Sequence, residues 1–260
     1  MDYGIRLFRH VVNQVFGNLS QALRISLVPA ILFGIAFYWA TDGFAVMGLF
    51  ASQFADPAQP VPSEEEFAAM AGFAGRAFVL VILGAVLFSW VAVAWHRYVL
   101  TEELSPWLPP FSAGRTLGYL GRTILIGLAL FAALIPISLL FGGLLATGNF
   151  AVGLFFGIAV NMLMSWLFVR WALILPARAI DRKLTFRESW DATSEVSGEI
   201  LVPIIGFAVI FTMITQVLIL LPSNPVFALL LAAVYWIQTL MNLALLTTLY
   251  GNRIEGRELN

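Results

Sequence analysis

The chain contains no cysteine, only two histidines and few charged residues. The missing cysteines exclude disulfides, thiolate chemistry and Fe–S ligation. Only 11% of the 260 residues are charged, whereas 60% are hydrophobic. Soluble domains carry about a quarter charged residues. A soluble core of this size could not bury so much apolar surface, so the composition indicates a membrane protein.

Catalytic and cofactor-binding motifs are missing as well. His10 and His96 each lie beside an arginine, and neither has a second ligand at the spacing of a zinc-binding helix. The chain has no Gly-x-Ser-x-Gly motif, no Gly-rich phosphate loop and no pair of membrane-embedded aspartates. Its net charge of −1 argues against attraction to nucleic acid. We therefore expect a non-enzymatic protein without a cofactor, a metal or a nucleic-acid partner.

Six long apolar stretches dominate the sequence. A helix needs about 20 apolar residues to cross a hydrocarbon layer of roughly 30 Å. The predicted spans cover residues 25–41, 77–96, 123–145, 152–177, 200–221 and 226–249. The expected fold is therefore a single all-α transmembrane bundle over residues 1–260, with interfacial amphipathic helices on the cytoplasmic side.

Basic residues gather on one side of these spans. Of the 14 Lys and Arg residues, all but Arg76 and Arg170 lie on the side of both termini, and Arg170 lies within the fourth span. The positive-inside rule identifies that side as the cytoplasm. We therefore expect a multi-pass protein of the bacterial inner membrane with both termini in the cytoplasm.

The first 26 residues predict an amphipathic helix and not a cleavable signal peptide, because charges interrupt their apolar residues. The apolar side chains recur at helical spacing, at Ile5, Phe8, Val12, Val15 and Phe16. Such a helix lies in the headgroup layer or pairs with another helix. The sequence leaves both interpretations open.

A second, longer helix is predicted to begin near residue 63. Ser63 and Glu66 have the spacing of a capping box. If this helix continues to about residue 98 it is roughly 50 Å long, which exceeds the hydrocarbon core. Its first turns are then expected to project into the outer compartment.

A weak internal repeat links the first and fifth spans. The segment LVPAILFGIAF opens the first, LVPIIGFAVIF opens the fifth, and Pro29 and Pro203 are in register. This pattern suggests three units, each an interfacial segment followed by a hairpin of two spans, as in repeat-built membrane proteins. Chance similarity between apolar segments is the alternative.

Arg170 is the residue of this sequence whose insertion into a membrane costs the most free energy. It lies about seven residues from the predicted cytoplasmic end of its span, roughly 10 Å deep. One interpretation is a side chain that reaches the inner headgroups along an apolar stem. The other is an anion contact, to a lipid phosphate or a substrate, through the planar donor fork. Asp191, Glu195 or Glu199 could also supply a structural partner.

Small and polar residues recur at four-residue intervals on the last three spans: Gly153, Gly157, Asn161, Ser165, Thr212, Gln216, Gln238 and Asn242. Glycines allow helix backbones to approach closely, and the polar groups can hydrogen-bond across a helix contact. We interpret these stripes as a helix-packing seam. A hydrated path for a polar solute is the alternative.

The segment VRWALILPARAIDRKLTFRESWDAT predicts a short cytoplasmic amphipathic helix containing Phe186, Ser189 and Trp190, with a capping box at Thr185 and Glu188. An in-span arginine followed by a proline, a polar break and a Ser-Trp helix resembles the membrane domain fused to some bacterial glycerophosphodiester phosphodiesterases and related stand-alone families of unknown function. The resemblance covers about a fifth of the chain. It implies no activity, since the catalytic phosphodiesterase domain is not in this sequence.

Two functions from different classes fit these observations. The preferred one is a non-enzymatic accessory, scaffold or assembly partner of a membrane complex or of lipids, anionic lipids included. Its candidate partners are lipids, another membrane protein or a second copy of the chain. The alternative is a transporter or channel for a small polar or anionic solute, which a hydrated cavity at the bilayer midplane would favour.

Overall fold

The computed structural model describes residues 2–42, 45–46, 63–145, 148–221 and 225–259, and all its regular elements in these ranges are helical. Six of the helices are long and apolar enough to span a membrane, which confirms the predicted helical membrane bundle. The helices are α1 (Asp2–Phe16), α2 (Leu19–Ala40), α4 (Glu64–Thr101), α5 (Ala113–Leu145), α6 (Phe150–Trp171), α7 (Ile174–Ala179), α8 (Phe186–Ala192), α9 (Leu201–Ile219) and α10 (Pro225–Arg253).

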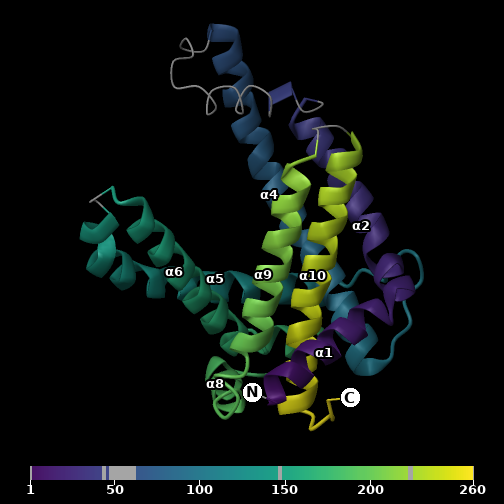
Figure 1. Ribbon diagram of the computed structural model, residues 1–260. Helices are drawn as coiled ribbons and strands as arrows, with labels where there is room; N and C mark the ends of the chain where they lie inside the picture. The colour runs from purple at the N-terminus through teal and green to yellow at the C-terminus, as the bar shows by residue number, and fades with distance from the viewer. Residues whose placement is uncertain (1, 43–44, 47–62, 146–147, 222–224, 260) are drawn as a thin grey trace.

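The six long helices form three helical hairpins, α2–α4, α5–α6 and α9–α10. In Figure 1 the helices α2, α4, α9 and α10 run alongside one another, whereas the α5–α6 hairpin points away from them. A hydrogen bond of 2.7 Å from Trp236 Nε1 to Ser26 Oγ connects α10 to α2. The hairpins match the predicted three units, while their common origin in a repeat stays a prediction.

The core lies in the half of the bundle that holds the two termini, around the last turns of α10. Leu249 and Ala244 are fully buried there, and so are Trp95 of α4 and Ile25 of α2. Elsewhere the spans expose large apolar side chains, such as Leu139 at 79%. This is expected of a surface surrounded by acyl chains, because lipid tails are as apolar as leucine.

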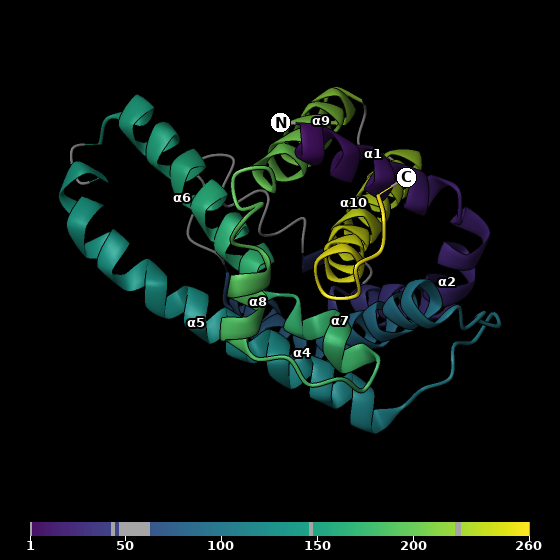
Figure 2. The same ribbon diagram turned by 90° about the horizontal axis from the view of Figure 1, so that it is seen from below.

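Helix α1 pairs with other helices, which decides between the two interpretations of the N-terminal segment. Its buried face consists of Gly4, Leu7, Val11 and Val15, packed on α9 and α10. Ile5 of the predicted apolar face is instead 51% exposed. Figure 2 shows α1 crossing the ends of α9 and α10.

Helix α4 begins as predicted. Ser63 accepts a hydrogen bond from the Glu66 backbone N–H, and the Glu66 carboxylate accepts one in return from the Ser63 backbone N–H. The helix runs unbroken for 38 residues, about 57 Å at 1.5 Å per residue. It is therefore longer than a hydrocarbon core of roughly 30 Å. Most of the acidic loop that precedes it, including Asp56, lies outside the described residues.

The fourth candidate span, Phe150–Ala179, contains the predicted range 152–177 but is not one continuous helix. Helix α6 ends at Trp171, and after a turn at Ala172 and Leu173 the chain continues as α7. Pro176 explains the break, because its ring clashes with the carbonyl four residues earlier, at Ala172, and it has no N–H to bond that carbonyl. Arg170 consequently lies in the last turn of α6.

Candidate binding cleft

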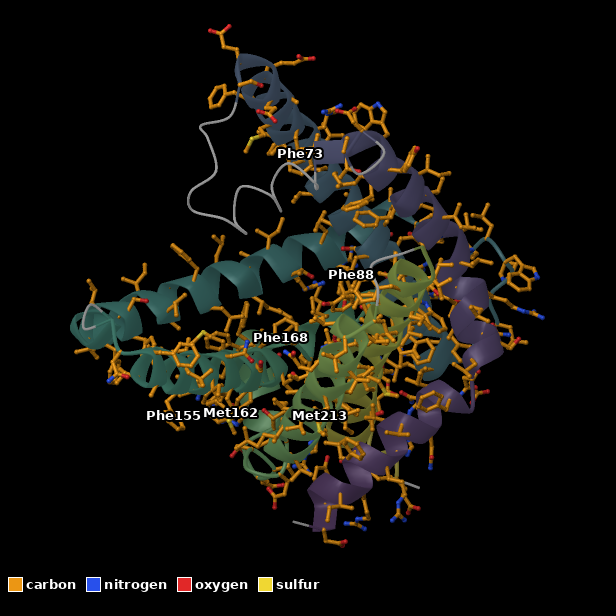
Figure 3. The ribbon with its side chains drawn as sticks, turned by 45° about the horizontal axis from the view of Figure 1, so that its top comes forward. Phe73, Phe88, Phe155, Met162, Phe168 and Met213 are labelled. Atoms are coloured by element: carbon orange, nitrogen blue, oxygen red, sulfur yellow. The ribbon has the colours of Figure 1, made fainter. Side chains whose placement is uncertain are left out.

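A cleft of about 1190 Å³ separates the α5–α6 hairpin from α9 and α10. Its walls are mainly apolar: α6 and α9 supply most of the lining, α10 adds a stripe, and Phe88 of α4 and Leu130 of α5 contribute from behind. Figure 3 shows Met162 of α6 and Met213 of α9 on opposite sides of this space. Three methionines, Met162, Met164 and Met213, give the lining adaptable side chains.

The structure brings most of the predicted seam residues to this cleft. The lining contains Gly153, Gly157, Asn161, Ser165, Thr212, Gln238 and Asn242. Gln216 is the exception, because it is exposed on α9 and does not line the cleft. Residues from all three stripes therefore face a common space.

The close helix packing predicted for these residues is not formed. A Cβ atom added at Gly153 or Gly157 would meet no other atom within 4 Å, whereas a packed glycine such as Gly4 would place a Cβ 2.6 Å from the Glu199 carbonyl oxygen. The physical reason is that the hairpin diverges from α9 and α10 (Figure 1). The glycine stripe of α6 lines the cleft and contacts no facing helix.

Polar groups of the lining lie near the middle of their helices. Asn161 is ten residues from the C-terminal end of α6, and Asn242 is eleven from that of α10, about 15 Å along each axis. Within the described part of the chain, neither amide hydrogen-bonds to another protein group, and both residues are exposed to the cleft. An amide without a partner in hydrocarbon costs about 4–8 kcal/mol on alkane scales, so these groups favour a polar occupant.

Arg170 does not line the cleft. Its side chain is 4% exposed, with Nη2 donating to the Trp190 carbonyl oxygen at 2.7 Å and Nε donating to Thr193 Oγ1 at 3.2 Å. The guanidinium carbon lies 3.6 Å from the centre of the Trp190 ring and 5.1 Å from that of Trp166. The two hydrogen-bond acceptors come from α8 and the residue after it, so the arginine holds α8 on α6. The interpretation in which the Arg170 side chain reaches the headgroups is therefore wrong, because the side chain is buried within the protein.

The acidic residues considered as partners of Arg170 do not hydrogen-bond to it. Asp191 pairs with Arg187 at 3.7 Å and adds only a longer-range Coulombic attraction to Arg170. Glu195 pairs with Arg253 at 2.5 Å. The charge of Arg170 is thus offset by a carbonyl, a hydroxyl and aromatic faces, which suits the weakly hydrated guanidinium.

Helix α8 has the predicted capping box, because Thr185 Oγ1 accepts from the Glu188 N–H and the Glu188 carboxylate accepts from the Thr185 N–H. The face predicted to lie on the inner membrane surface contacts α6 instead. Ser189 Oγ donates to the Arg170 carbonyl oxygen at 2.6 Å, and the Phe186 ring meets Trp171 edge to face. Trp166 Nε1 further donates to the Ser197 carbonyl oxygen at 2.8 Å. These contacts join the C-terminal end of α6 to the segment that leads into α9.

His96 is fully buried, although Arg97 follows it in the sequence. Its Nδ1 lies 2.8 Å from Thr247 Oγ1, and its Nε2 lies 3.3 Å from the Tyr119 hydroxyl. Since the Thr247 hydroxyl proton is donated to the Leu243 carbonyl oxygen, Thr247 must accept from Nδ1–H, and Nε2 accepts from Tyr119. This neutral tautomer satisfies both ring nitrogens and links α4, α5 and α10. The position of His10 and His96 beside arginines gave no signal of this contact.

A second, polar hollow of about 610 Å³ lies beside the C-terminal segment, lined in part by Arg182, Glu255 and Arg257. Its charges pair internally: Glu255 accepts from Arg257 at 2.8 Å and lies 3.4 Å from Arg182. Arg257 also donates to the carbonyl oxygens of Val99 and Leu100. The hollow therefore fastens the C-terminal segment to α4 and leaves little charge for a ligand.

The fold and the cleft define a polytopic α-helical membrane protein. Comparison with known proteins adds no closer assignment, because no protein-family model, no curated protein and no solved structure matches the chain.

Proposed function

We propose that this chain is a non-enzymatic accessory protein of the bacterial inner membrane that holds a lipid in the cleft between α6 and α9–α10. The observation that supports this most directly is the lining itself. A concave, mainly apolar space with a few convergent polar groups is the usual form of a small-ligand site. The predicted resemblance to the membrane part of phosphodiesterases is compatible with this role, since catalysis there belongs to a separate soluble domain.

The chemistry of the lining favours binding over catalysis. General acid–base catalysis needs a titratable side chain within reach of the reacting group. Among the described residues, those that line the cleft include no Asp, Glu, His, Lys or Arg. The amides and hydroxyls that are there can orient a ligand by hydrogen bonds but cannot exchange protons with it near neutral pH.

Transport of a small polar solute is the second candidate. The middle position of Asn161 and Asn242 along their helices supports it, because intramembrane polar residues often mark solute pathways. The two functions differ in what fills the cleft: acyl chains in a lipid-binding protein, water in a transporter.

Single-cysteine variants can distinguish the two functions, because the native chain has no cysteine that would react. We expect Asn161→Cys in proteoliposomes to react with a membrane-soluble maleimide and to resist a charged, impermeant one added to either side. A matched control, Arg187→Cys, has a side-chain position that is 91% exposed in the native protein and should react with both reagents. Rapid labelling of Asn161→Cys by the impermeant reagent would contradict lipid binding and favour transport.

A further inference from the structure

The polar groups of the cleft are all uncharged. They come from Asn161, Ser165, Thr212, Gln238, Thr239 and Asn242. The Thr239 hydroxyl proton is donated to the Tyr235 carbonyl oxygen, whereas each carboxamide offers two donors and an acceptor. We infer that the cleft selects an uncharged amphiphile, a lipid whose polar part consists of hydroxyl, ester or amide groups without an ionised headgroup. This inference rests on the proposed lipid-binding function.

Cations near the cytoplasmic end are engaged elsewhere. Arg170 donates to Trp190 and Thr193, and Arg253 donates to the Ala192 carbonyl oxygen while pairing with Glu195. A phosphate drawn into the cleft would lose hydration without gaining a counter-charge. Because burial of an unpaired charge is strongly unfavourable, the lining discriminates against anionic lipids and anionic solutes.

The position of the amides along their helices points to a small polar group. Asn161 and Asn242 lie ten and eleven residues from the C-terminal ends of α6 and α10, about 15 Å along each helix axis. A charged headgroup stays in the interfacial layer and cannot descend that far. A lipid with a hydroxyl or an ester as its whole polar part can sink into the hydrocarbon and place these groups against the amides.

The shape of the cleft favours a lipid over a helix of another chain. Its walls are joined at the cytoplasmic end, where Trp166 donates to the Ser197 carbonyl oxygen, and they separate along the hairpin (Figure 3). A helix keeps a constant width of about 10 Å along its length, whereas flexible acyl chains adapt to a space that tapers.

The test compares two lipids that differ only in the phosphate. The full-length protein is incubated in phosphatidylcholine vesicles containing equal amounts of dioleoylglycerol and dioleoyl phosphatidic acid, purified, and its bound lipids are measured by mass spectrometry. We expect dioleoylglycerol to be retained over phosphatidic acid by about tenfold or more. The double variant Asn161→Leu/Asn242→Leu should lose this preference. The control Gln216→Leu removes an exposed amide outside the cleft and should keep it.

A second pair of variants tests the cleft itself. Gly157→Leu adds a side chain where the lining is open and should reduce retention of both lipids, whereas Gly127→Leu, equally open but outside the lining, should not. Equal or greater retention of phosphatidic acid would overturn the inference and leave lipid binding intact. Retention that is unaffected by Gly157→Leu would overturn the proposed function, as would a co-purified protein or a second copy cross-linked at Asn161→Cys.

Discussion

At the scale of single residues, the most informative side chain is Arg170. An arginine in a predicted span suggested a ligand contact, but its hydrogen bonds go to the Trp190 carbonyl and the Thr193 hydroxyl. Its guanidinium carbon lies 3.6 Å from the centre of the Trp190 ring and 5.1 Å from that of the Trp166 ring. The residue is therefore a structural clamp between α6 and α8.

We predict that Arg170→Lys destabilises the protein although it keeps the charge. A lysine ammonium cannot reproduce the donors Nε and Nη2 together with the contact to the Trp190 ring, and a lost hydrogen bond from a charged group costs about 1.5–3 kcal/mol. Thermal denaturation in detergent should show a lower Tm, and limited proteolysis should cleave the segment 180–200 faster.

The matched control is Arg187→Lys, whose side chain is 91% exposed and whose replacement should leave the Tm unchanged. If Arg170→Lys were as stable as the native protein but retained less anionic lipid, the clamp would be wrong. The anion-contact interpretation would then take its place.

At the scale of elements, α8 depends on a capping box and on its contact with α6. The helix has only seven residues, fewer than the roughly 12–15 needed for even marginal stability in water. Its ends must therefore be held by caps and tertiary contacts. The hydrogen bonds from the Thr185 backbone and hydroxyl lower the pKa of Glu188 below its ordinary value of 4.5.

This shift gives a pH dependence of defined sign. A carboxyl whose pKa is lower in the folded state stabilises the fold above its unfolded pKa, and the stabilisation is lost as the pH falls through the folded value. We predict that the native protein is more stable than Glu188→Gln at pH 6. The difference in Tm should shrink as the pH falls below about 4.5.

Thermal denaturation of the two proteins in parallel from pH 6 to pH 3.5 measures this difference, and the control Glu65→Gln on α4, outside the capping box, should show no such trend. A Tm difference between native protein and Glu188→Gln that stays constant down to the lowest pH would exclude the capping carboxylate as its source.

At the scale of the whole molecule, the two termini lie at the same end of the bundle. Figure 1 shows them close together, and the Tyr3 hydroxyl donates to Asn252 Oδ1 at 2.8 Å. An even number of crossings requires this arrangement, and six candidate spans supply it. The distribution of the basic residues predicts that this end faces the cytoplasm.

We predict that periplasmic reporter fusions after residues 58, 148 and 224 are active, whereas fusions after residues 108 and 260 are not, because the basic residues hold those segments in the cytoplasm. Paired cytoplasmic reporters at the same positions should give the inverse pattern. An active periplasmic reporter at residue 260 would contradict the orientation.

The sequence alone determined the membrane class, the six helical spans, the α4 start and the α8 capping box. Each of these depends on local composition or on residues three or four apart, which a single helix places together whatever surrounds it. The stripe that carries Asn161 and the stripes of α9 and α10 were predictable for the same reason.

Only the tertiary structure decided what these residues do. The glycine stripe of α6 carries the same sequence whether another helix packs on it or not, and the divergence of the α5–α6 hairpin leaves it lining a cleft. Arg170 and Trp190 are 20 residues apart, and His96 and Thr247 are 151 apart. Such contacts depend on how helices pack, because a local pattern fixes which face of a helix is polar but not which group it meets.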